Sequence, residues 1–185
     1  MALLESVLVP LNGKMPDFEL QDPSGKSYKA SAMIGEKDRG LLVVFTCNHC
    51  PYALAVWPRV IKMAKYAKGM RVHTLAVNPN IHPDYPEDSA ENMKKKIQEW
   101  GLDFPYLVDE AQATAKAYKA QCTPDIYLLD REMKLVYHGR IDDSWQDESK
   151  VTHEELKEAL NNFAAGLPVD RKQNPSMGCS IKWRA

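Results

Sequence analysis

A run of five apolar residues leads into a pair of cysteines, and this junction constrains the fold more than any other stretch of the chain. The run covers residues 41–45 and is typical of a strand buried on both faces of a sheet. From Pro51 to about Lys68, apolar residues recur at three- and four-residue intervals, which predicts an amphipathic helix. Cys47 and Cys50 are therefore predicted to lie on the first turn of a helix that follows a buried strand.

Two cysteines at a helix start are suited to thiol–disulfide exchange. The unsatisfied N–H groups and the positive end of the helix dipole favour a thiolate over a thiol. We expect Cys47, nearer the helix start, to be the more acidic sulfur and to attack a partner. Cys50 would then resolve the mixed disulfide, because two intervening residues let the second sulfur reach the first.

His49 stands directly before Cys50, where an imidazole beside Cys47 would stabilise the thiolate. The alternative is an exposed loop histidine without a role. For the cysteine pair, the alternatives are half of a zinc site or a chance spacing. A structural zinc site needs two such ligand pairs and the chain has one, so no metal site is predicted.

A second motif lies downstream of the cysteine pair. Thr123-Pro124-Asp125 leads into an apolar strand at residues 126–129, and with the Cys-x-x-Cys turn it resembles the thioredoxin superfamily. Together with Met15-Pro16-Asp17-Phe18-Glu19-Leu20, the chain resembles the peroxiredoxin-like (redoxin or thiol-specific antioxidant) branch of that superfamily. The resemblance implies a cis-proline loop at Pro124 that faces the cysteines. Thr123 and Pro124 would offer backbone hydrogen bonds to an extended substrate segment.

The chain departs from its relatives in ways that bear on activity. Thr46 replaces the tryptophan that precedes the first cysteine in thioredoxins, and the strand at 41–45 carries no aspartate to accept a proton from the resolving thiol. Three residues before Cys50 stands Cys47, where the peroxidatic loop of peroxiredoxins has threonine. We therefore expect a thiol–disulfide oxidoreductase. The alternatives are an antioxidant peroxide reductase that uses the same cysteines and a Cu(I)-handling protein, because soft thiolates beside a histidine suit Cu(I).

Two further cysteines are candidates for a third redox cysteine. Cys122 immediately precedes the Thr-Pro pair, and the alternative is a small buried hydrophobe. Cys179 lies in an apolar tail with Trp183, which we expect to dock on the domain. Such docking would make Cys179 redox-active if it came within disulfide range of Cys47 or Cys122.

The alternation of strand and helix patterns predicts an α/β fold, and the resemblance implies a thioredoxin-like fold with a central mixed sheet and helices on both faces. A stretch dense in Pro, Asn and Asp at residues 78–88, followed by a helical pattern at 89–100, marks one helical insertion. We expect one redoxin domain at residues 1–166, including an N-terminal hairpin, and a C-terminal tail at 167–185.

The net charge and the N-terminal sequence restrict the classes of partner that we expect. A net charge of −1 offers no electrostatic case for nucleic acid, and the N-terminus has neither a signal-peptide nor a membrane-span pattern. We expect a cytoplasmic protein, where cysteines are more often catalytic than structural. Its substrate would be a protein or small-molecule disulfide, or a peroxide, with a thiol donor such as a thioredoxin and no organic cofactor.

Overall fold

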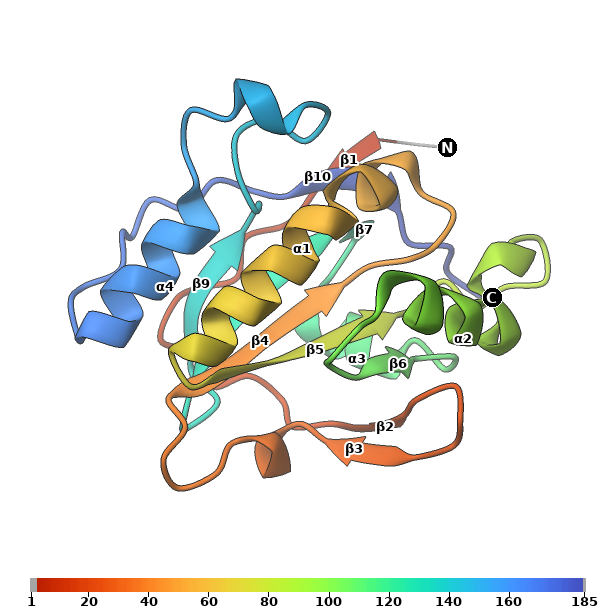
Figure 1. Cartoon of the computed structure of the whole chain (residues 1–185), viewed down its shortest axis with the longest axis horizontal. Helices are drawn as coiled ribbons and strands as arrows, with labels where there is room; N and C mark the ends of the chain where they lie inside the picture. The colour runs from red at the N-terminus through yellow and green to blue at the C-terminus, as the bar shows by residue number, and fades with distance from the viewer. Residues whose placement is uncertain (1–2, 185) are drawn as a thin grey trace.

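The computed structural model describes residues 3–184, so the outermost ends of the two expected segments, residues 1, 2 and 185, lie outside it. Its main sheet has seven strands in the order β3-β2-β6-β5-β4-β8-β9 (Figure 1). In chain order they are β2 Glu19–Gln21, β3 Ser27–Lys29, β4 Gly40–Phe45, β5 Val72–Asn78, β6 Tyr106–Val108, β8 Asp125–Asp130 and β9 Leu135–Gly139.

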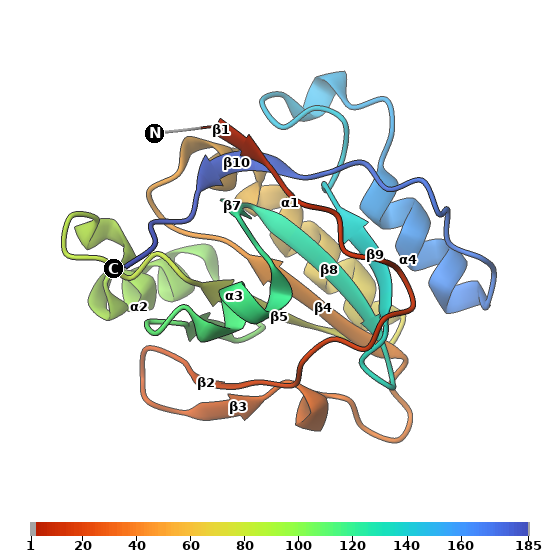
Figure 2. The same ribbon diagram turned by 180° about the vertical axis from the view of Figure 1, so that it is seen from behind.

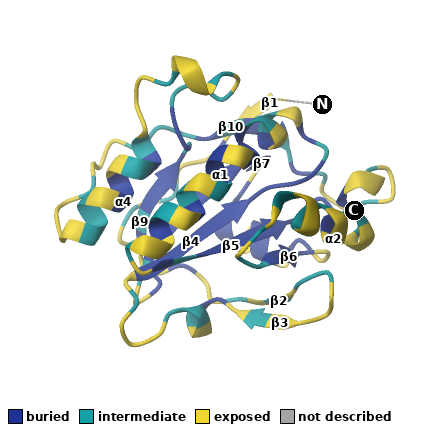
Figure 3. Ribbon diagram, in the orientation of Figure 1, coloured by how far each residue is buried: buried dark blue, intermediate teal, exposed yellow. Residues whose placement is uncertain are grey.

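β4 is the central strand, as its apolar run predicts. It pairs in parallel with β5 and antiparallel with β8, so the sheet is mixed. All six of its residues are buried, because helices or loops cover both faces of the sheet at this position (Figure 3).

Helices lie on both faces of the sheet and enclose two separate cores, as expected for this fold class (Figures 1 and 2). The four helices are α1 Pro51–Gly69, α2 Ala90–Trp100, α3 Ala113–Tyr118 and α4 Glu155–Ala165. Residues of α1, α2 and α4 pack against Leu42 and Val44 on one face of β4. Residues of α3 and the N-terminal segment pack against Leu41, Val43 and Phe45 on the other face. Short 3-10 turns occur at Ser31–Met33, Pro86–Asp88 and Glu148–Lys150.

A second, three-stranded sheet lies beside the start of α1. It consists of β1 Leu3–Glu5, β10 Met177–Ser180 and β7 Cys122–Thr123, with β10 in the middle (Figure 2). β10 comes from the segment expected to form a tail, and it pairs antiparallel with both neighbours. The C-terminal segment is therefore part of the folded structure at the place where the cysteine turn lies.

Trp183, which the sequence predicts to dock on the domain, does so only in part: Lys116 Nζ of α3 lies 5.7 Å from the centroid of its ring, and the side chain remains 42% exposed. Ile181 is buried instead, and the Lys182 backbone is bound by two side chains. Its N–H donates to Asn80 Oδ1 at 2.8 Å, and its carbonyl accepts from Gln112 Nε2 at 2.7 Å. Strand pairing and backbone hydrogen bonds, rather than an aromatic anchor, fix the path of the chain. Among residues 3–184, no helix is long and apolar enough to cross a membrane.

Candidate active site

The two cysteines lie in the turn that joins β4 to α1. Cys50 is the N-cap residue of α1, and Pro51 occupies the first helical position. Cys47 precedes the helix, so the expectation that both cysteines sit on its first turn is wrong. The Trp57 indole N–H donates to the Cys47 carbonyl oxygen at 3.1 Å, which ties the turn back to the second turn of the helix.

Both sulfurs are fully buried and meet the Thr-Pro loop. Cys47 Sγ lies 3.2 Å from the hydroxyl oxygen of Thr123, and Cys50 Sγ lies 3.4 Å from the Thr123 carbonyl oxygen. The Thr123–Pro124 peptide bond is cis, as the resemblance implied. The loop that the sequence placed opposite the cysteines is therefore in direct contact with them through Thr123.

The pKa values of the two thiols are shifted in opposite directions. Burial raises the pKa of Cys47 well above its ordinary value, and the nearby Asp88 carboxylate raises it further. A hydrogen bond from the Cys47 thiol lowers the pKa of Cys50 to about 5, with help from the Ala53 backbone N–H in the first helical turn. The expectation that Cys47 is the more acidic sulfur is thus wrong in this closed arrangement, because burial and Asp88 disfavour a thiolate at Cys47, whereas the Cys47 side chain favours one at Cys50.

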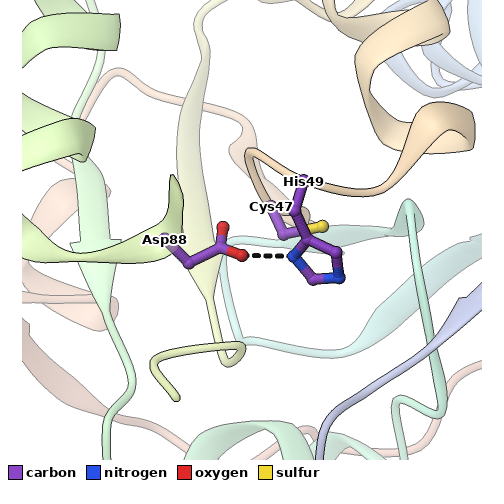
Figure 4. A group of neighbouring side chains, drawn as sticks. All are labelled: Cys47, His49 and Asp88. Carbon is purple, nitrogen blue, oxygen red and sulfur yellow. Dashed lines mark hydrogen bonds and ion pairs between the residues drawn. The ribbon is translucent and has the colours of Figure 1, made fainter. Parts of the chain in front are cut away.

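His49 and Asp88 form a buried pair beside Cys47 (Figure 4). The imidazole Nδ1 is hydrogen-bonded to one oxygen of Asp88. The other oxygen accepts hydrogen bonds from the Asn48 backbone N–H at 2.6 Å and from Asn78 Nδ2 at 2.8 Å. An ionised carboxylate can only accept, so Nδ1 carries the proton and Nε2 is left as an acceptor. Nε2 is buried and has no hydrogen-bond partner among residues 3–184.

Asp88 is a residue that the sequence did not single out. It ends the stretch at 78–88 that was interpreted as an insertion, and its carboxylate is completely buried. The strand before the cysteines carries no aspartate that could accept a proton. A carboxylate reaches the site instead from the 3-10 turn Pro86–Asp88, after the neighbouring strand β5. A Pro- and Asp-rich stretch gives no local pattern that tells a buried aspartate from an exposed one.

The same group has donor atoms suited to a metal ion. The Cys47 sulfur, a His49 ring nitrogen and an Asp88 oxygen all lie within 4.8 Å of one another. However, the Asp88 oxygens already accept three hydrogen bonds, so an ion at this position would have to displace some of them. The hydrogen-bonded pair accounts for the arrangement without an ion.

A second buried network supports the start of β8. Asp125 follows Pro124 and accepts hydrogen bonds from Tyr127 Oη at 2.9 Å and from His138 Nε2 at 3.0 Å. His138 Nδ1 accepts the Val9 backbone N–H, so Nε2 carries the proton. His138 received no role from the sequence, and the structure gives it this supporting contact.

The remaining cysteines occupy different environments. Cys122 Sγ lies 3.9 Å from the Pro124 carbonyl oxygen and 4.0 Å from that of Ser176, and burial raises the pKa of its thiol. Cys179 instead packs in one cluster with Cys47, Cys50 and Ala53. The structure thus brings the tail cysteine to the active-site pair and leaves Cys122 in a separate, buried position.

The chain is similar to several known proteins. The thiol-disulfide oxidoreductase ResA of Bacillus subtilis is 25% identical over 121 residues, which are 65% of this chain and 62% of ResA. This chain therefore matches less than two thirds of that relative's length. A crystal structure of an uncharacterized conserved protein from Geobacillus kaustophilus matches with a TM-score of 0.92 and 42% identity, covering 100% of this chain and 97% of that one.

The peroxidoxin BcpB of Mycobacterium tuberculosis shares the fold at 15% identity, with a TM-score of 0.65 over 85% of this chain and 98% of that one. These neighbours confirm the thioredoxin-like fold predicted from the sequence. The model of the AhpC/TSA family matches residues 11–138. This match includes the cysteine turn, the Asp88 segment and the Thr123–Pro124 loop, and the chain belongs to the AhpC/TSA family.

Proposed function

We propose that the protein is a thiol–disulfide oxidoreductase whose redox couple is Cys47 and Cys50. The observation that carries the proposal is the convergence of both buried sulfurs on Thr123 at the start of α1, with Cys47 Sγ 3.2 Å from its hydroxyl oxygen and Cys50 Sγ 3.4 Å from its carbonyl oxygen. Two thiols that pack in one cluster and contact the same residue are placed to form a disulfide with each other. The names of the ResA relatives support the same reaction class.

In the closed, reduced form the negative charge rests on Cys50 and the proton on Cys47. Moving this proton along the hydrogen bond makes Cys47 the thiolate, which attacks a substrate disulfide and releases the first substrate thiol. Cys50 then loses its proton and attacks Cys47 Sγ, which releases the second substrate thiol and leaves a Cys47–Cys50 disulfide. A thiol donor such as a thioredoxin reduces this disulfide and completes the cycle.

The His49–Asp88 pair supplies a proton acceptor for this sequence. Asp88 orients the imidazole through Nδ1, and His49 presents its other nitrogen as a base. A ring nitrogen of His49 lies within 4.8 Å of Cys47 Sγ, so the imidazole is near enough to exchange a proton with this sulfur after a modest shift of the ring. In this scheme His49 exchanges protons with the thiols, and Asp88 is a positioning residue.

The test is reduction of a disulfide substrate such as insulin with dithiothreitol as donor. Cys47→Ser and Cys50→Ser should each abolish turnover, whereas Cys122→Ala, checked for an unchanged melting temperature, should retain it. Activity that survives both serine variants would refute the proposal. A reduction potential of about −270 mV for the Cys47–Cys50 couple would indicate a reductase, and one of about −120 mV would indicate an oxidase.

A second candidate function is reduction of a peroxide, which the family match favours. A Cys47 thiolate would attack the peroxide and release an alcohol or water, and Cys50 would then displace hydroxide from the sulfenic acid, forming the same disulfide. Consumption of hydrogen peroxide with dithiothreitol, faster than the uncatalysed reaction and lost in Cys47→Ser, would support this activity. An unchanged rate would leave disulfide exchange as the function.

Handling of Cu(I) is the third candidate, favoured by the cluster of Cys47, His49 and Asp88. Thiolate and imidazole are suitable ligands for this soft ion. Stoichiometric retention of Cu(I) against a competing chelator, lost in His49→Ala, would support it. Release of the ion at the rate of a Cys47→Ser control would argue against it.

A further inference from the structure

The tail strand β10 places Cys179 over the active-site pair. In the antiparallel ladder with β7, Cys179 lies directly opposite Thr123, and Ser180 lies opposite Cys122. Residues that face each other in such a ladder point to the same side of the sheet, and their neighbours in sequence point to the other side. Because the Thr123 hydroxyl contacts Cys47, Cys179 also faces the sulfurs, while Cys122 faces away.

Cys179 packs against the active-site pair. It is buried in one cluster with Cys47, Cys50 and Ala53, so its thiol lies among the active-site sulfurs. Burial first, and the interaction with the Cys50 sulfur second, raise the pKa of Cys179 to about 12, so Cys179 keeps the proton and Cys50 keeps the charge. Cys50 thus lies between two thiols, one from its own turn and one from the tail.

Gly178 shows that β10 is closely fitted to the Thr-Pro loop. A Cβ atom at this position would lie 2.0 Å from the Thr123 carbonyl oxygen and 3.1 Å from the Pro124 nitrogen. Any side chain would therefore push the strand away from the loop. Beyond the strand, Ile181 N–H donates to the Gln121 carbonyl oxygen at 2.9 Å and continues the pairing.

β10 consequently occupies the edge of β7 to which an extended substrate would add, and both active-site sulfurs are 0% exposed beneath it. We propose that Cys179 is the third cysteine of the exchange site, and that β10 is an internal strand docked where a substrate strand would bind. The proposal rests on the function proposed above and adds an internal disulfide between Cys50 and Cys179.

The number of disulfide bonds does not change in this step. In the oxidised protein, Cys179 loses its proton to the His49 imidazole, the base of the proposed function, and its sulfur attacks Cys50 Sγ. The Cys47–Cys50 bond breaks, the Cys50–Cys179 bond forms, and the electron pair leaves with Cys47, which takes up the proton. Cys47 is then a thiol again, ready for another substrate, while a dithiol donor reduces the Cys50–Cys179 bond and is itself oxidised to a disulfide.

Mapping of disulfides tests the proposal. The reduced protein is treated with one equivalent of diamide, denatured in iodoacetamide and digested without reductant. The wild type should yield both Cys47–Cys50 and Cys50–Cys179 peptides, and Cys47→Ser should yield Cys50–Cys179 alone. In Cys47→Ser/Cys179→Ser the bridge to Cys50 should be lost, although Cys122 is still present as a buried control thiol. Circular dichroism checks that each variant is folded.

The outcomes separate the two proposals. If Cys179 is fully alkylated in both the wild type and Cys47→Ser while the wild type forms Cys47–Cys50, the third-cysteine proposal is wrong and the proposed function stands. If folded wild type forms neither bridge, the proposed function fails as well. A Cys50–Cys122 bridge in Cys47→Ser would also overturn the assignment, because it would show that the ladder does not select Cys179.

Discussion

His49 and Asp88 are joined by a buried hydrogen bond although 39 positions separate them in the sequence. The pair lies beside Cys47, and its second imidazole nitrogen has no partner among the described residues (Figure 4). A carboxylate hydrogen-bonded to an imidazole gives a thiol site both a base and a group that orients this base.

Asp88→Asn should slow disulfide exchange by roughly a hundredfold, because general acid–base catalysis commonly contributes that much. The amide cannot hold the imidazole as a carboxylate does, and loss of the negative charge should also lower the pKa of Cys47. The measurement is kcat against pH for insulin reduction. Asp84→Asn is the matched control, because Asp84 is an exposed carboxylate in the same loop. Equal rates in the two variants would show that Asp88 has only a structural role.

The reduced protein should contain a thiolate at neutral pH. Cys50 has a pKa of about 5, so thiolate absorbance at about 240 nm should rise as the pH passes upward through this value, well below the ordinary cysteine pKa of about 8.5. The step should vanish in Cys50→Ser. In Cys47→Ala it should move to higher pH, because the side chain whose hydrogen bond contributes most to lowering the pKa is gone. A wild-type step near the ordinary value would contradict a lowered pKa at Cys50.

Cys50→Ser should accumulate mixed disulfides with substrate proteins, because Cys47 can attack but the second exchange step lacks its thiol. Cys47→Ser should accumulate far fewer. Non-reducing gels of the variants incubated with oxidised substrate measure the difference. The reverse result would make Cys50, which holds the charge in the closed form, the first attacker.

Gly178→Ala should open the site, because the added methyl group cannot fit against the Thr123 carbonyl oxygen. Alkylation of Cys50 in the native protein should accelerate about tenfold or more, which corresponds to about 1.4 kcal/mol lost from docking of β10. Gly69→Ala is the control, since a Cβ there meets nothing within 4 Å. An alkylation rate equal to that of the control would mean that β10 does not limit access to the sulfurs.

The central strand and the helix after it were predictable from the sequence because their signals are local. The apolar run at 41–45 and the spacing after Pro51 correspond closely to β4 and α1, and the helical pattern at 89–100 corresponds to α2 with its N-cap Ser89. The resemblance placed Thr123 and Pro124 opposite the cysteines, and Thr123 is in contact with both sulfurs.

The tertiary structure alone decided the surroundings of the sulfurs. Asp88 reaches His49 because β5 lies parallel to β4 and ends at the same edge of the sheet, a relationship that no local pattern in the 78–88 stretch reveals. Burial of Cys47 beside Asp88, and the contact of Cys50 with the Cys47 side chain, reversed the expected order of acidity. For the tail, the register of β10 against β7 turned Cys179 toward Cys50 and left Trp183 partly exposed. A shift by one residue would turn Cys179 to the opposite face, and this register depends on backbone pairing between segments more than fifty residues apart.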